Sequence, residues 1–99
     1  MIQVIVFYSL KEEFSTQFTK VFKALEPHVQ AEEGCLQYEV FVSPTTSTRF
    51  CLVEKWLSQE ALNKHMKTKQ LANFREQSES WFEQKPVIEL KTIENERYL

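Results

Sequence analysis

The segment CLQYEVFVSPTTSTRFCLVEKWL, residues 35–57, holds the pattern that decides the fold. In residues 35–42 apolar side chains alternate with polar ones, and residues 49–57 are again rich in β-branched and aromatic residues, so both segments are predicted strands. Residues 43–48 between them have the composition of a turn. The segment therefore predicts an antiparallel β-hairpin in the middle of the chain.

An amphipathic helix is predicted on the N-terminal side of this hairpin, over residues 11–33. Its apolar residues recur at four- and three-residue spacing, which places them on one face. They are Phe14, Phe18, Phe22 and Leu25, with Val21 and Val29 beside them. We expect Pro27 to kink or restart the helix, because proline lacks a backbone N–H and clashes with the preceding turn. Gly34, the only glycine, is a candidate C-cap.

Helical segments are also predicted on the C-terminal side. Ser58 is a candidate N-cap, since its hydroxyl can accept from the free N–H groups of a first turn. The apolar face of the helix that follows holds Ala61, Leu62, His65 and Met66. A second amphipathic segment over residues 70–84 directs Leu71, Phe74, Trp81 and Phe82 toward the core. Pro86 is expected to end it, and residues 87–94 form a last strand.

The first strand is predicted over residues 2–8, a nearly continuous apolar run typical of a central position in a sheet. The order of elements is then β-α-β-β-α-β, the ferredoxin-like arrangement of an α+β domain with a four-stranded antiparallel sheet. All 99 residues fit one domain.

Both helices on one face would leave the other face of the sheet apolar and uncovered. The residues assigned to that face are Ile2, Val4, Val6, Val40, Val42 and Val53. Because a monomer rarely exposes so large an apolar patch, we expect a second copy to cover it. The sequence predicts a homodimer through the sheet face.

Composition excludes several classes of partner. The formal net charge is −2 with acids and bases interspersed, whereas a nucleic-acid binder usually has a basic face. No apolar run approaches the roughly 20 residues needed to span a bilayer, and the N-terminal residues do not resemble a signal peptide. We expect a soluble, cytoplasmic protein. Cys35 and Cys51 fall too far apart on the predicted hairpin for a disulfide, so we expect two free thiols.

Few residues offer catalytic chemistry. One glycine excludes a glycine-rich phosphate loop, and His28 and His65 are too isolated for a zinc site, so no metal is expected. Phe50, Leu52, Glu54 and Trp56 share one face of their predicted strand. An ionised Glu54 there is costly to bury unless it is paired or has a task.

His65 is expected to point toward the same interior from the helix that follows. An imidazole near a carboxylate can act as a general acid or base near neutral pH. The structural alternatives stay open: His65 as a satisfied core residue, Glu54 as half of a salt bridge, and Trp56 as core packing. Tyr8 and Tyr38 can each donate a hydrogen bond into a pocket or pack against the sheet.

Three segments resemble the antibiotic biosynthesis monooxygenase family. They are EGCLQY (residues 33–38), RFCLVEKW (residues 49–56) and ALNKH (residues 61–65), and Phe74 fits a later aromatic position of the pattern. The resemblance covers nearly the whole chain. It implies a dimeric ferredoxin-like α+β barrel with a pocket between sheet and helices in each protomer. It also implies a monooxygenase that oxidises a small phenolic or quinol substrate without metal, flavin or haem.

The resemblance further implies roles for individual residues. His65 matches the family histidine and would act as base or hydrogen-bond donor, and Glu54 would orient it. Trp56 matches the tryptophan of the pocket wall. Phe50, Tyr38 and Phe74 are the other expected substrate-binding residues.

The sequence departs from some branches of that family. Several oxygenases carry Asn on the first strand, where this chain has Gln3 and Val6. Haem-degrading members use a His near the position of Phe74, which argues against haem degradation. A branch that isomerises a phosphorylated sugar is the second reading, although Arg49 and Lys55 are the only basic residues on the third strand. A non-catalytic ligand-binding module is the third.

Overall fold

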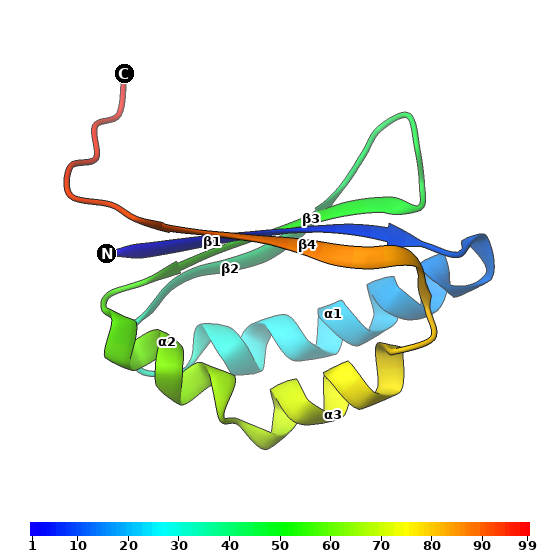
Figure 1. Cartoon of the computed structure of the whole chain (residues 1–99), viewed down its shortest axis with the longest axis horizontal. Coiled ribbons are helices and arrows are strands. Elements are labelled where there is room, and N and C mark those ends of the chain that lie inside the picture. The colour runs from blue at the N-terminus through cyan, green and yellow to red at the C-terminus, as the bar shows by residue number, and fades with distance from the viewer.

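Four strands and three α-helices make up the computed structural model, which describes all 99 residues (Figure 1). The elements are β1 (Ile2–Leu10), the 3-10 turn η1 (Glu12–Phe14), α1 (Ser15–Gln30), β2 (Cys35–Val42), β3 (Arg49–Trp56), α2 (Gln59–Met66), α3 (Lys69–Ser78) and β4 (Phe82–Thr92). This order confirms the predicted α+β, ferredoxin-like fold, with the second helical region divided into α2 and α3.

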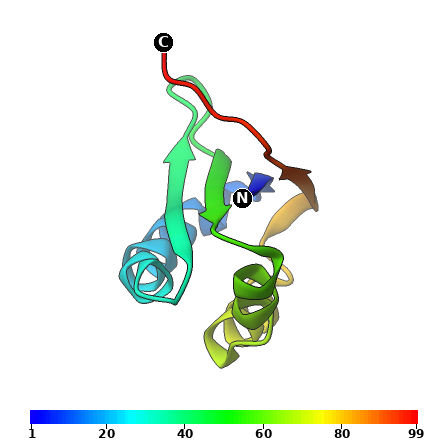
Figure 2. The ribbon, with the colours of Figure 1, turned by 90° about the vertical axis from the view of Figure 1, so that its left-hand side faces the viewer.

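The four strands form one antiparallel sheet in the order β2-β3-β1-β4. The predicted hairpin pairs β2 with β3, and the predicted central strand, β1, lies between β3 and β4. All helices cover the same face of the sheet (Figures 1 and 2). On that face α1 lies beneath β2, and α2 and α3 lie beside α1. No helix is long and apolar enough to cross a membrane.

The prediction for the last helix and strand was wrong in its boundary. Helix α3 ends at Ser78 and β4 begins at Phe82, so Pro86 lies inside the strand. The strand tolerates the proline because β4 is an edge strand and its register shifts there: Phe7 pairs with Val87 and Ser9 with Gln84, which leaves one residue of β1 opposite two of β4. Such a bulge on an edge is where a sheet accommodates proline.

The end of α1 also differs from the prediction. The helix runs through Pro27 to Gln30, and its C-cap is Ala31 in ordinary right-handed geometry. Gly34 lies in the turn to β2 with φ +80°, a conformation that L side chains rarely adopt. It also lies against α2, since a Cβ at this position would be 2.5 Å from the Cβ of Ala61. The glycine thus sets the turn and the approach of α2, instead of capping α1.

Most of the residues that the sequence analysis assigned to the uncovered sheet face lie on the opposite face, under the helices. Strand register puts Val4 opposite Glu54 and Val6 opposite Leu52, and all of these side chains are buried on the helix side. The apolar residues that face away from the helices are Ile5, Phe7, Phe41, Cys51, Val53 and Val87, which we call the outer sheet patch. Only Val53 was assigned correctly, because strict alternation moves a whole strand to the other face when one residue is misplaced.

Aromatic side chains fill the core between α1 and the sheet. The predicted apolar stripe of α1 is buried, with Phe18 at 0% and Phe22 at 1% exposure. Phe18 contacts Phe50 of β3 at a ring-centroid distance of 4.7 Å. Cys35 and Cys51 are free, as predicted, and burial raises the pKa of the Cys35 thiol to about 11, with Glu32 and Glu54 adding to the effect.

Candidate active site

A cavity of about 350 Å³ lies between the sheet and helices α2 and α3. Twelve of its 19 lining residues are hydrophobic, among them Val4, Val6, Leu52, Leu62, Phe74, Ile88 and Leu90. Its polar or charged lining residues include Glu54, Gln59, Asn63, His65, Arg75 and Ser78, and two of the twelve hydrophobic residues, Tyr8 and Tyr38, also carry a hydroxyl. A mostly apolar hollow with a few convergent polar groups is the usual form of a small-molecule site.

Helix α2 fixes the position of His65 at the wall of this cavity. The hydroxyl of Ser58 accepts from the backbone N–H of Ala61 at 3.1 Å, which caps the helix as predicted. His65 follows Ala61 by four residues, so it lies on the same face of α2, packs against the sheet and is 2% exposed. Its ring stacks on Trp56 with centroids 4.7 Å apart. The helix and the tryptophan together hold the imidazole in one orientation.

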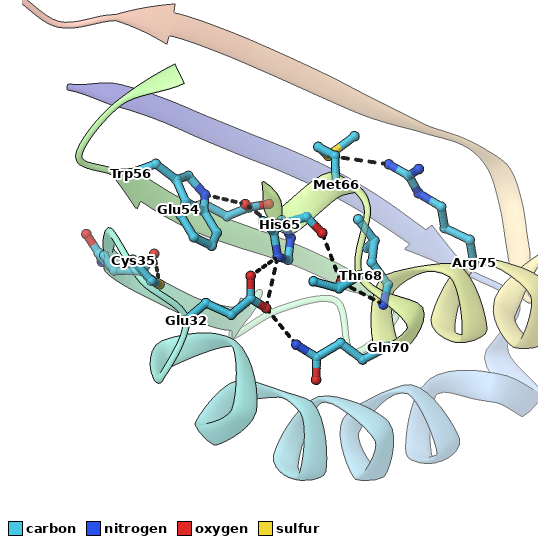
Figure 3. Close-up of polar contacts among 11 residues, drawn as sticks. Glu32, Cys35, Glu54, Trp56, His65, Met66, Thr68, Gln70 and Arg75 are labelled. Carbon is cyan, nitrogen blue, oxygen red and sulfur yellow. Dashed lines mark hydrogen bonds and ion pairs between the residues drawn. The ribbon is translucent and has the colours of Figure 1, made fainter. Parts of the chain in front are cut away.

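Glu32 is the carboxylate that binds His65. Its two oxygens lie 3.0 and 3.2 Å from His65 Nδ1, and Gln70 Nε2 donates to Glu32 Oε2 at 2.6 Å (Figure 3). Sequence reasoning missed Glu32, which lies 33 positions before His65 in the turn between α1 and β2. No local pattern marks it, because only the packing of α2 against that turn brings the two side chains together.

Glu54 lies on the other side of the imidazole. Its Oε1 is 4.0 Å from His65 Nε2 and accepts a hydrogen bond from Trp56 Nε1 at 2.9 Å. Burial raises the pKa of the Glu54 carboxyl above its ordinary value, and the Trp56 hydrogen bond and His65 oppose the shift. Glu54 therefore accepts from Trp56, and the carboxylate within hydrogen-bonding distance of His65 is Glu32.

Two phenol hydroxyls face the cavity without a partner. Neither Tyr8 nor Tyr38 makes a side-chain hydrogen bond within the chain, yet no fully buried side-chain polar atom lacks a partner. Both hydroxyls therefore keep accessible surface, and both residues line the cavity. Burial, followed by the negative charge of Glu54, raises the pKa of each phenol. They remain neutral hydrogen-bonding groups at physiological pH.

The predicted site residues are brought together only in part. His65, Glu54, Tyr38 and Phe74 line the cavity. Trp56 lies behind His65 with 0% exposure, and Phe50 packs on Phe18, so neither lines it. Tyr8 also lines it, and so does Arg75, which was not predicted. No group of three or more His, Cys, Asp or Glu side chains is arranged to hold a metal ion.

The sequence matches a known family and a curated relative. The family model described as "Antibiotic biosynthesis monooxygenase" matches residues 1–77. The chain is 30% identical over 74 residues to a Bacillus subtilis protein named "Putative monooxygenase YcnE", covering 75% of this chain and 78% of that protein.

Solved structures agree with the fold. A Caulobacter crescentus protein is 27% identical with a TM-score of 0.86, covering 94% of this chain and 90% of its own. A Deinococcus radiodurans protein is 15% identical with a TM-score of 0.92, covering 100% and 98%. Both are named as putative antibiotic biosynthesis monooxygenases. From the family model that matches most of its length and the relative that shares its sequence, this chain belongs to the antibiotic biosynthesis monooxygenase family.

Proposed function

We propose that this protein is a monooxygenase that oxidises a small phenolic or quinol substrate, without an external cofactor, in the cavity between the sheet and helices α2 and α3. The observation that carries the proposal is His65, held by Glu32 at 3.0 Å and lining an apolar cavity of about 350 Å³. Such a cavity has room for one or two aromatic rings and surrounds them with apolar side chains. Membership of the family supports the same class of reaction.

His65 is the base in this proposal. With its Nδ1–H donated to Glu32, the imidazole presents an unprotonated Nε2 that can accept a proton from a phenol hydroxyl. Tyr8 and Tyr38 offer hydrogen bonds to the substrate oxygens from the sheet side. The apolar walls exclude water, which protects reactive intermediates from side reactions.

The substrate supplies all the electrons. A deprotonated quinol is electron-rich enough to reduce O₂, one oxygen atom then enters the ring, and the other leaves as water. The reaction balances as quinol plus O₂ giving hydroxyquinone plus water, so it needs no separate reductant. The protein binds the ring, removes the proton and excludes water.

Oxygen consumption by the purified, chelator-treated protein with a panel of hydroquinones tests the proposal. We expect substrate-dependent uptake that falls by about 10²–10⁴-fold in His65→Gln, the range that general acid–base catalysis contributes. Glutamine can keep a hydrogen bond to Glu32 but cannot take a proton. His28→Gln is the matched control, because His28 is exposed on α1. Absence of uptake across the panel, or equal uptake in His65→Gln with an intact circular dichroism spectrum, would contradict the proposal.

An acid–base isomerase of a small carbonyl compound is the second candidate. It is favoured by the buried Glu54 carboxyl, whose pKa is raised by burial, at 4.0 Å from His65 Nε2. A carboxyl group beside an imidazole can supply the acid and the base that enolisation requires. Conversion of substrate under strictly anaerobic conditions would favour the isomerase. Ligand-dependent stabilisation with no turnover would instead indicate a binding module.

A further inference from the structure

Arg75 is the only lysine or arginine that lines the cavity. It extends from α3 toward Met66 of α2, and its Nη2 donates a long hydrogen bond to Met66 Sδ at 3.9 Å (Figure 3). No carboxylate lies within ion-pairing distance of it, although the chain forms ion pairs elsewhere, such as Lys55 with Glu96 at 2.7 Å. A guanidinium carries five N–H donors, so most of those on Arg75 are left to water.

The carboxylates that also face this region are already engaged. Glu32 accepts from Gln70 and contacts His65, and Glu54 accepts from Trp56. The charge of Arg75 nevertheless reaches the cavity: it opposes the burial that raises the pKa of Tyr8 and Glu54. The cavity therefore has one positively charged lining residue, the exposed Arg75, and one lining carboxylate, Glu54, which accepts from Trp56.

A neutral ligand in the cavity leaves the donors of Arg75 to solvent, because the side chain is exposed. A carboxylate offers two oxygens in the geometry that a guanidinium matches, and such charge-assisted pairs are stronger than neutral hydrogen bonds. The arrangement of this rim selects for an anionic substituent on the ligand.

We propose that Arg75 forms an anion subsite at the mouth of the cavity, and that the substrate is an aromatic compound with a carboxylate meta or para to its reacting hydroxyl. The inference rests on the proposed function only in taking this cavity as the substrate site. The hydroxyl lies toward His65, Tyr8 and Tyr38, and the carboxylate pairs with the guanidinium between α2 and α3.

Binding of two matched probes tests the subsite. Gentisate is a hydroquinone that carries a carboxylate, and gentisamide has the same shape without the charge. By isothermal titration calorimetry under anaerobic conditions, we expect gentisate to bind about tenfold or more tightly than gentisamide. The preference disappears in Arg75→Gln and is retained in part in Arg75→Lys. Arg75 is exposed, so these variants are expected to fold.

Arg49→Gln is the matched control, since it removes an exposed arginine that does not line the cavity. Equal affinity for the two probes, a preference that survives Arg75→Gln, or binding of neither probe would overturn the subsite. Oxygen uptake separates this result from the proposed function. Binding of gentisate through Arg75 without oxygen uptake keeps the subsite and rejects the oxygenase, whereas uptake with uncharged quinols at equal efficiency keeps the oxygenase and rejects the subsite.

Discussion

At the scale of single residues, the environment of His65 is asymmetric. Nδ1 lies within hydrogen-bonding distance of the half-buried Glu32, whereas Nε2 lies 4.0 Å from the buried Glu54. A carboxylate bound to one ring nitrogen fixes the proton there and leaves the other nitrogen free to act as an acceptor. The two carboxylates thus have separate contacts: Glu32 lies against Nδ1 of the imidazole, and Glu54 lines the cavity.

Replacement of Glu32 should disturb this arrangement without removing the imidazole. In Glu32→Gln the amide can either donate or accept, so we expect His65 to lose its fixed tautomer in ¹⁵N NMR spectra. We also expect turnover to fall by about tenfold or more, a part of the ~10²–10⁴-fold that general acid–base catalysis contributes. The control is Glu33→Gln, whose exposed carboxylate pairs only with Lys64 at 3.7 Å. An unchanged tautomer in Glu32→Gln would contradict the positioning role.

Glu54 predicts a dependence of stability on pH. Burial raises its pKa above the ordinary 4.5, so the folded state binds more protons than the unfolded state as pH rises above that value. The free energy of unfolding should therefore decrease with rising pH between 4.5 and the raised pKa. Glu54→Gln removes this contribution, and urea denaturation should show the variant gaining stability relative to the native protein as pH increases. Glu39→Gln, at an exposed position of β2, should show no such trend.

At the scale of elements, the turn between α1 and β2 controls how closely α2 approaches the sheet. Gly34 has φ +80° and lies where a Cβ would be 2.5 Å from the Cβ of Ala61. The backbone N–H of Leu57 also donates to the Gly34 carbonyl at 2.8 Å, which joins this turn to the end of β3. Because α2 carries His65 and the turn carries Glu32, this contact also sets the distance between the two side chains.

A side chain at position 34 should therefore be destabilising for two separable reasons. We expect Gly34→Ala to cost about 2–4 kcal/mol, from the positive φ and from the contact with Ala61. A double-mutant cycle with Ala61→Gly isolates the second reason, because glycine at 61 relieves the contact and leaves φ unchanged. Chemical denaturation of the four proteins gives the coupling energy. A coupling energy near zero would show that the two positions are not in contact.

At the scale of the whole molecule, the outer sheet patch has no cover within the chain. Phe7 and Phe41 are 41% and 46% exposed, and Val53 lies opposite Ile5 at the middle of the patch. We propose that a second copy covers it, which retains the predicted homodimer with a corrected set of residues. Contiguous apolar surface of this kind is usual in interfaces.

Val53→Lys tests that interface. A lysine at the centre of the patch would be buried without a partner in a dimer, so light scattering should report a shift from twice the chain mass to the mass of one chain. Leu57→Lys places the same charge at an apolar residue that is 65% exposed outside the patch, and it should leave the dimer intact. A native protein that remains monomeric at high concentration would exclude this interface.

The sequence by itself determined the order of elements, the central hairpin, the buried stripe of α1 and the approach of His65 and Glu54 to one interior. These features follow from local periodicity, which acts over a few residues and is written in the chain. It misplaced β4 because Pro86 is a helix terminator in isolation, whereas an edge bulge accommodates it.

Only the tertiary structure decided which residues complete the site. Glu32 meets His65 across 33 positions, Arg75 reaches the cavity from α3, and Phe50 and Trp56 turn out to lie behind the walls. None of these relations has a local signal, because each depends on how two separately formed elements pack. Strand register likewise decided which alternate residues of each strand face away from the helices. The sequence does not specify this, because the central strand has apolar residues on both faces.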